Sequence, residues 1–274
     1  MTDIPRTYPQ GVTSWIDTEQ PDPEAAERFY SELFGWEFSN AAPPGAPAYL
    51  IARLDGEDAA AIAAGPRPAR WNTYIAVTDA DETVRAIADA GGAVLAQPAD
   101  AGPAGRTATC ADPQGARFRL WQAGRRLGVQ AVNWPGAWNF SDIRTTDPAA
   151  SRDFYSGLFG WRYLDLGETV ESMIAVPGYG DHLAATADPG IRERQAGAPE
   201  GFADVIGAME PTEGAEAAHW RVKFSVADRE AGMATARRLG ATVLGTEDQV
   251  WALLADIRDP QGAEFTISEF RERD

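Results

Sequence analysis

Histidine and cysteine, which often serve as general bases, nucleophiles and transition-metal ligands, are scarce in this chain. Its 274 residues include two histidines, His182 and His219, and one cysteine, Cys110. One cysteine excludes an intrachain disulfide and any multi-cysteine zinc or iron–sulfur site, and two histidines exclude a histidine-rich metal cage. Because histidine titrates near neutral pH, we predict that His182, next to Asp181, is a general acid or base. The alternative is a solvated structural histidine, the role expected for His219.

The composition is that of a globular protein with a strong acidic excess. Hydrophobic residues make up 44% and charged residues 24% of the chain, which suits about two domains of roughly 100–200 residues each. Lysine and arginine number 24 against 41 acidic residues, giving a net charge of −17. This balance argues against nucleic acids and anionic membranes as partners. Since the sequence shows neither a signal peptide nor a membrane span, we expect a cytoplasmic protein.

The chain contains an internal duplication. The segment PDPEAAERFYSELFGWEF (21–38) matches TDPAASRDFYSGLFGWRY (146–163), and ADPQGARF (111–118) matches RDPQGAEF (258–265). A third pair of matching blocks, at 71–95 and 220–244, lies between them in the same order. Repeats in a fixed order mark homologous structural units. We therefore predict two domains, 10–123 and 135–270, forming an internal pseudo-dimer; the sequence leaves a further homodimer open.

Local signals place the elements that must position the candidate residues. An aspartate followed by proline starts the first helix of each repeat, at Asp22 and Asp147, and a glycine follows its end, at Gly35 and Gly160. Three short strands follow this helix, a strand precedes it, and the same order then recurs within the repeat. The chain is therefore predicted to be α+β, with four βαβββ modules and mostly antiparallel sheets.

These repeated motifs resemble the vicinal oxygen chelate superfamily, which includes glyoxalases, extradiol dioxygenases and bleomycin-resistance proteins. The motifs that carry the resemblance are DPxxAxxFYxxLFGW and DPQGAxF, and it covers almost the whole chain. It implies two glyoxalase-like domains in which paired modules curl their sheets into a cup. It also implies that metal-dependent members place histidine, glutamine or glutamate ligands on the first, fifth and last strands of a domain.

Strand alternation predicts which side chains face the cups. In RVKFSV (221–226) the apolar residues must face the helices, so Arg221 and Lys223 face inward. The same rule selects a set of residues that we predict to bind substrate: Trp15, Asp17, Asn72, Tyr74, Arg119, Trp121, Phe140, Arg144, Arg221, Lys223 and Glu264. Asp142, also inward, is predicted to assist catalysis. The arginines favour an anionic ligand and the tryptophans an aromatic one, unless internal carboxylates such as Asp142 or Glu264 already compensate the arginines.

The family's metal-ligand positions fall on residues that are unsuited to the task. They are Trp15, Asn72 and Arg119 in the first repeat and Phe140, Arg221 and Thr266 in the second. A divalent first-row metal needs several oxygen, nitrogen or sulfur donors, and an arginine places a permanent cation there instead. We therefore predict no cofactor. One carboxylate with water ligands, at Asp17 or Asp142, could still hold a divalent ion weakly.

The second repeat contains extra sequence that predicts a lid. Aligning DGED (55–58) with GYGD (178–181) puts His182 at the start of a strand and leaves residues 187–218 as an insertion. Long loops are often lids or binding loops. Closure would bring Tyr179, Asp181, His182 and either Arg192 or Arg194 onto one small-molecule ligand. The sequence thus predicts a metal-independent lyase, isomerase, cyclase or hydrolase; the alternative is a non-catalytic protein that sequesters an antibiotic or another small molecule.

Overall fold

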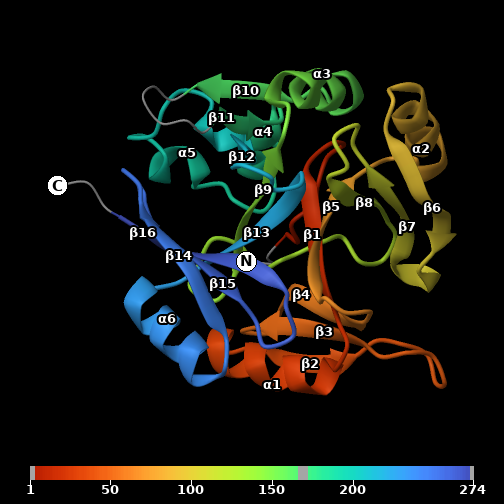
Figure 1. Ribbon diagram of the computed structural model, residues 1–274. Helices are drawn as coiled ribbons and strands as arrows, with labels where there is room; N and C mark the ends of the chain where they lie inside the picture. Colours follow the sequence, from red (N-terminus) through yellow and green to blue (C-terminus); the bar gives the residue numbers. More distant parts are fainter. Residues whose placement is uncertain (1–3, 166–171, 272–274) are drawn as a thin grey trace. The chain divides into compact units, whose positions relative to one another are not determined.

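The computed structural model describes residues 4–165 and 172–271 (Figure 1). The first repeat folds as a strand, a helix and three strands, twice over. Its elements are β1 (Thr13–Gln20), α1 (Pro23–Phe34), β2 (Glu37–Asn40), β3 (Tyr49–Leu54), β4 (Glu57–Ala64), β5 (Arg70–Ala76), α2 (Ala80–Asp89), β6 (Ala93–Asp100), the short η1 (Gly102–Ala104), β7 (Gly105–Ala111) and β8 (Arg117–Ala123).

The second repeat has the same order with additional short helices. Its elements are β9 (Trp138–Thr145), α3 (Pro148–Phe159), β10 (Arg162–Asp165), β11 (Ser172–Ala175), α4 (Tyr179–Ala185), α5 (Ile191–Arg194), η2 (Phe202–Asp204), β12 (Val205–Pro211), β13 (His219–Ser225), α6 (Arg229–Arg238), β14 (Thr242–Asp248), β15 (Ala252–Arg258) and β16 (Glu264–Phe270). Among the described residues, no helix is long and apolar enough to cross a membrane.

Each repeat contributes one eight-stranded mixed sheet. The strand orders are β2-β3-β4-β1-β5-β8-β7-β6 and β10-β11-β12-β9-β13-β16-β15-β14. Within each module the first and last strands pair in parallel, as β1 with β4 and β13 with β16, and the remaining pairs are antiparallel. This arrangement confirms the α+β fold of four βαβββ modules.

The compact units of the chain do not follow the repeats. One unit comprises residues 1–15, 73–128 and 141–220, and the other comprises residues 16–72, 129–140 and 221–274. Each unit therefore combines one module from each repeat. We call them unit 1 and unit 2.

The core of unit 2 joins α1 to the strands of the last module. Phe34 on α1 stacks against Phe224 on β13 at 4.7 Å between ring centroids, and Tyr30 lies 5.9 Å from Phe265 on β16. Ile267 faces α6, because a side chain at Gly232 on that helix would meet it at 2.9 Å. These contacts confirm the predicted core side of β13 and β16, and α1 and α6 lie side by side in Figure 1.

Unit 1 has an equivalent aromatic core. Tyr155 on α3 stacks on Trp161 at 4.7 Å and contacts Phe118 on β8 at 5.8 Å, with Trp220 edge-on to both Tyr155 and Trp161. Ile143, predicted to face the core, is fully buried in this cluster. The FY and LFGW residues of both repeats are therefore core residues.

The predicted helix starts and ends are confirmed. The Asp22 and Asp147 carboxylates accept hydrogen bonds from the amides of Ala25 and Ala150, both at 3.0 Å. Gly35 and Gly160 end the helices in the left-handed conformation that favours glycine.

The extra segment of the second repeat lies elsewhere than predicted. Residues 205–211, which we assigned to the insertion, form β12, the counterpart of β4, so the additional helices precede this strand. Gly178 adopts a left-handed φ of 86° and the Asp204 carboxylate accepts hydrogen bonds from the amides of Gly178 (3.2 Å) and Gly180 (2.7 Å). This capping starts α4 where a hairpin turn was expected. His182 therefore lies on a helix, and the prediction that it starts a strand is wrong.

Candidate functional site

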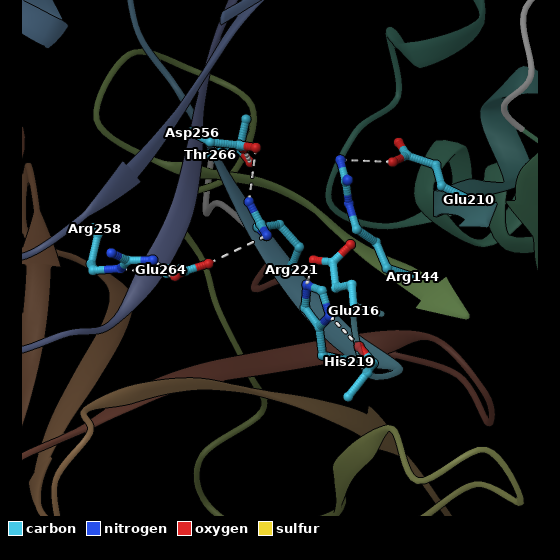
Figure 2. A network of polar contacts seen from close by, with 10 residues as sticks. Arg144, Glu210, Glu216, His219, Arg221, Asp256, Arg258, Glu264 and Thr266 are labelled. Atoms are coloured by element: carbon cyan, nitrogen blue, oxygen red, sulfur yellow. Dashed lines mark hydrogen bonds and ion pairs between the residues drawn. The ribbon is translucent and has the colours of Figure 1, made fainter. Parts of the chain in front are cut away.

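The polar face of β13, β15 and β16 in unit 2 carries an ion-pair network centred on Arg221 (Figure 2). Nη1 of Arg221 lies 2.9 Å from Oδ2 of Asp256, and Nη2 lies 3.5 Å from Oε2 of Glu264. The Thr266 hydroxyl donates to the other Asp256 oxygen at 2.5 Å. Only 6% of the Arg221 side chain is exposed, against 29% for Asp256 and 35% for Glu264. The cation is thus buried beneath two partly accessible carboxylates.

Strand register produces this cluster. Asp256 on β15 pairs with Thr266 on β16, and Thr266 pairs with Lys223 on β13, so their side chains share one face of the sheet. Their chain neighbours Ile257, Phe265 and Phe224 are fully buried on the opposite face. The inward orientation predicted for Arg221, Lys223, Glu264 and Thr266 from alternation follows from this register.

Sequence reasoning missed Asp256 and assigned Glu264 a different partner. Asp256 lies just before the DPQG motif, and alternation along β15 would have placed it on the polar face. Glu264 was expected to pair with Lys223, but its carboxylate accepts hydrogen bonds from Nε (2.9 Å) and Nη2 (2.7 Å) of Arg258 as well as approaching Arg221. Arginine forms such two-pronged contacts with a carboxylate because its guanidinium is planar.

A second polar group of unit 2 surrounds Asp17. Its carboxylate is fully buried and accepts hydrogen bonds from the Asn72 amide (2.8 Å) and the Tyr49 hydroxyl (3.2 Å). Phe140, the remaining candidate of this unit, is half-buried on β9. Neutral donors around a buried carboxylate stabilise its charge.

In unit 1, the candidates from the first repeat form an aromatic and cationic cluster. Nη1 of Arg119 donates to the Tyr74 hydroxyl at 2.7 Å, and the Tyr74 ring lies edge-on to Trp121 at 6.2 Å. Arg126 stacks over Trp15 at 5.4 Å from the ring centroid, an arrangement that favours cation–π attraction. Trp15, Tyr74 and Trp121 are all buried.

The candidates on β9 in unit 1 also have internal partners. Nη2 of Arg144 forms an ion pair with Glu210 on β12 at 2.9 Å (Figure 2), and Oδ1 of Asp142 accepts a hydrogen bond from the Ala208 amide at 2.8 Å. Glu210 was part of the segment that we predicted to be a lid. It is instead a strand residue that supplies the carboxylate for Arg144.

The His182 ring packs against the N-terminal segment of unit 1. Its Nε2 lies 2.8 Å from the Thr7 hydroxyl and 3.2 Å from the Thr7 carbonyl oxygen. The neighbouring Tyr179 hydroxyl accepts a hydrogen bond from Arg6 at 3.3 Å. Burial raises the pKa of Tyr179 above its usual value, which keeps its hydroxyl protonated. Within the described residues His182 makes no contact with Asp142, so the predicted acid–base group is not brought together.

The remaining titratable candidates lie apart from these clusters. Asp181 forms an ion pair with Arg192, but 78% of the Asp181 side chain and 61% of the Arg192 side chain are exposed. Arg194 pairs with Asp188 on the same short helical segment. His219 contacts the Ala217 carbonyl oxygen at 2.9 Å and Glu216 at 3.6 Å (Figure 2). Cys110 is fully buried, which raises the pKa of its thiol to about 12 and makes it a poor nucleophile at neutral pH.

The side chains at the family's metal-ligand positions do not fit a divalent transition metal. Arg221 and Arg119 contribute cations at two of the six positions, and the Thr266 hydroxyl donates its proton to Asp256. Across the described residues, no three histidine, cysteine, aspartate or glutamate side chains group as metal ligands would. The Asp17 and Asp142 carboxylates, proposed for a weakly bound ion, accept hydrogen bonds from N–H and O–H donors.

Two tandem pairs of βαβββ modules, each with a mixed eight-stranded sheet, define a protein of the vicinal oxygen chelate class. The chain belongs to the glyoxalase-like domain family, whose model matches residues 15–121 and again residues 140–268.

Named relatives span almost the whole chain. "Putative glyoxylase CFP32" of Mycobacterium tuberculosis is 35% identical over 269 residues, covering 95% of each chain. "Anthracycline biosynthesis protein DnrV" of Streptomyces peucetius is 32% identical over 286 residues, covering 97% of this chain and 95% of that protein.

Solved structures share the fold at low sequence identity. The Mn(II)-bound glyoxalase from Novosphingobium aromaticivorans has a TM-score of 0.60 at 15% identity, covering 97% of this chain and 85% of that chain. The 2,3-dioxygenase LapB from Pseudomonas sp. KL28 has a TM-score of 0.60 at 12% identity, covering 97% and 94%. At these identities the similarity establishes the fold, and function must be argued from the site.

Proposed function

We propose that this protein is a glyoxalase-fold enzyme that acts on a small organic molecule without a divalent metal ion. The polar centre of the proposed site is the cluster of Arg221, Asp256, Glu264 and Thr266 in unit 2. The observation that carries the proposal is the buried Arg221, which occupies a metal-ligand position and is held by two carboxylates.

The cluster supplies the groups that such chemistry needs. A fixed guanidinium can stabilise negative charge that develops on a substrate oxygen, which is the service a metal ion renders elsewhere in the superfamily. The partly exposed Asp256 and Glu264 carboxylates can accept a proton from a bound molecule. Lyase, isomerase, cyclase and hydrolase reactions all fit this equipment.

The relatives narrow the molecules to test. One relative is named an anthracycline biosynthesis protein and another a glyoxylase. Polycyclic aromatic ketones of the anthracycline type and the hemithioacetals of 2-oxoaldehydes are therefore the first two substrate classes to try.

The test is a turnover assay on protein stripped of metals with a chelator. Each compound is incubated with the wild type, with Arg221→Gln and with Asp248→Asn, and products are detected by mass spectrometry. Asp248→Asn is the matched control, because Asp248 pairs with Arg229 at 2.5 Å outside the proposed site. We expect product with the wild type and the control, and at least a tenfold loss of rate with Arg221→Gln, as for the removal of one stabilising charge (about 1.4 kcal/mol).

Two results would contradict the proposal. Turnover that appears only after a metal ion is added would show that metal independence is wrong. Binding without turnover across the panel would favour the non-catalytic alternative, a protein that sequesters its ligand.

A further inference from the structure

We infer that the Arg221 cluster is built for an uncharged polar ligand, such as a ketone, hydroxyl or amide, and not for an anion. This inference rests on the proposed function, because it names the ligand class of the same site. It also departs from the anionic ligand that the inward-facing arginines predict from sequence.

The charges of the cluster compensate one another. Arg221 and Arg258 contribute two cations, and Asp256 and Glu264 contribute two carboxylates, all joined by contacts of 2.7 to 3.5 Å. Glu264 lies between the two guanidinium groups, and Asp256 ties Arg221 to the Thr266 hydroxyl (Figure 2). At neutral pH these four side chains sum to zero.

Accessibility favours the negative end of the cluster. The Arg221 guanidinium is the most buried of the four charged groups, whereas Asp256 and Glu264 are each about a third exposed. An incoming anion would therefore meet carboxylate oxygens before it met the Arg221 nitrogens. Like charges at such short range repel, and the chain's net charge of −17 adds to the repulsion.

An uncharged ligand avoids this repulsion. Its hydroxyl or amide N–H could donate to the exposed carboxylate oxygens, and its carbonyl could accept from a guanidinium N–H, without separating the ion pairs. Breaking an ion pair of this kind leaves a buried charge without compensation and is strongly unfavourable. The arrangement selects polarity without charge.

Removing one carboxylate should reverse the preference. In Asp256→Asn the side chain keeps its shape and can still accept from Thr266, but Arg221 loses a compensating charge. We measure the thermal shift caused by 2-naphthoate and by its neutral match 2-naphthamide, with Asp248→Asn as the control. We expect the wild type and the control to favour the amide, and the ratio of naphthoate to naphthamide affinity to rise about tenfold in Asp256→Asn, as expected for one charge contact near the surface.

A second measurement does not depend on the choice of aromatic probe. The melting temperature is followed against sulfate concentration at constant ionic strength for the wild type, Asp256→Asn and Glu264→Gln. Both site variants should gain more from sulfate than the wild type does, because each leaves a cation in excess.

The possible outcomes separate the two proposals. If the wild type prefers naphthoate, or if neither site variant gains sulfate dependence, charge compensation is wrong. If neither naphthyl compound stabilises the wild type while the site variants do gain sulfate dependence, charge compensation stands and the proposed aromatic substrate class fails.

Discussion

The Tyr30 hydroxyl on α1 of the first repeat donates a hydrogen bond of 2.8 Å to the Asp259 carboxylate in the DPQG turn of the second repeat. Asp259 also accepts from Gln20 at 2.7 Å and from the backbone amides of Gln261, Gly262 and Ala263. Unit 1 repeats the contact between Tyr155 and Asp112 at 3.2 Å. The two motifs that reveal the duplication in the sequence are therefore bonded to each other within each compact unit.

Replacing Tyr30 with phenylalanine should destabilise the protein. The hydroxyl donates to Asp259 and accepts from the Trp71 indole at 3.2 Å, and both partners are buried. Leaving buried polar groups without partners costs about 1–3 kcal/mol each. Urea denaturation should show a loss in this range, with a smaller loss for Tyr155→Phe, whose bond to Asp112 is longer. Equal stability of Tyr30→Phe and the wild type would show that the bond contributes nothing.

An isolated first repeat should not be a stable monomer. In the full chain, Phe34 and Tyr30 are covered by Phe224 and Phe265 of the second repeat. A fragment of residues 10–123 would expose these rings, and exposed apolar surface of that kind drives association. Sedimentation should show dimers or aggregates, and an equimolar mixture with 135–270 should restore the helical signal of the full chain. A monomeric, cooperatively folded fragment would contradict the observed pairing of modules.

Two glycine substitutions to alanine should act in opposite directions. At Gly105 the new Cβ would lie 2.5 Å from the Gln122 carbonyl oxygen and 2.8 Å from the Trp121 ring, so we expect a loss of about 1–3 kcal/mol. At Gly157, within α3, it would meet nothing within 4 Å, and we expect a gain of about 0.5–1 kcal/mol from the better helix propensity of alanine. Chemical denaturation measures both. A stable Gly105→Ala would show that the β7–β8 pairing leaves room beside Trp121.

The contact of His182 with Thr7 should hold α4 in place. In His182→Ala and Thr7→Val the hydrogen bond is lost, and amides of residues 179–185 should exchange with deuterium several-fold faster. His219→Ala is the control, since His219 contacts only the loop before β13 among the interactions described above, and it should leave this segment unchanged. If His182→Ala abolishes turnover without changing exchange in α4, the sequence-based assignment of His182 as a catalytic residue is favoured.

Periodicity and motif matching could predict most of the fold but only half of the site's logic. The inward orientation of Arg221 follows from the alternation of β13, because Val222 and Phe224 must be buried. The partner Asp256 depends on the register between β15 and β16, a pairing of distant residues that local patterns do not encode. His182 was misplaced because GYGD resembles a hairpin turn, whereas a carboxylate twenty-two residues further on, Asp204, caps it as a helix start.

The central claim is that the site works without a divalent metal. The most direct test is metal analysis of the purified protein after saturation with Mn²⁺, Fe²⁺, Ni²⁺ or Zn²⁺ and gel filtration, combined with ligand binding before and after chelation. We expect substoichiometric metal and unchanged binding, because Arg221 occupies a ligand position as a permanent cation. One equivalent of metal per chain, with binding lost to the chelator and restored by the metal, would contradict this account.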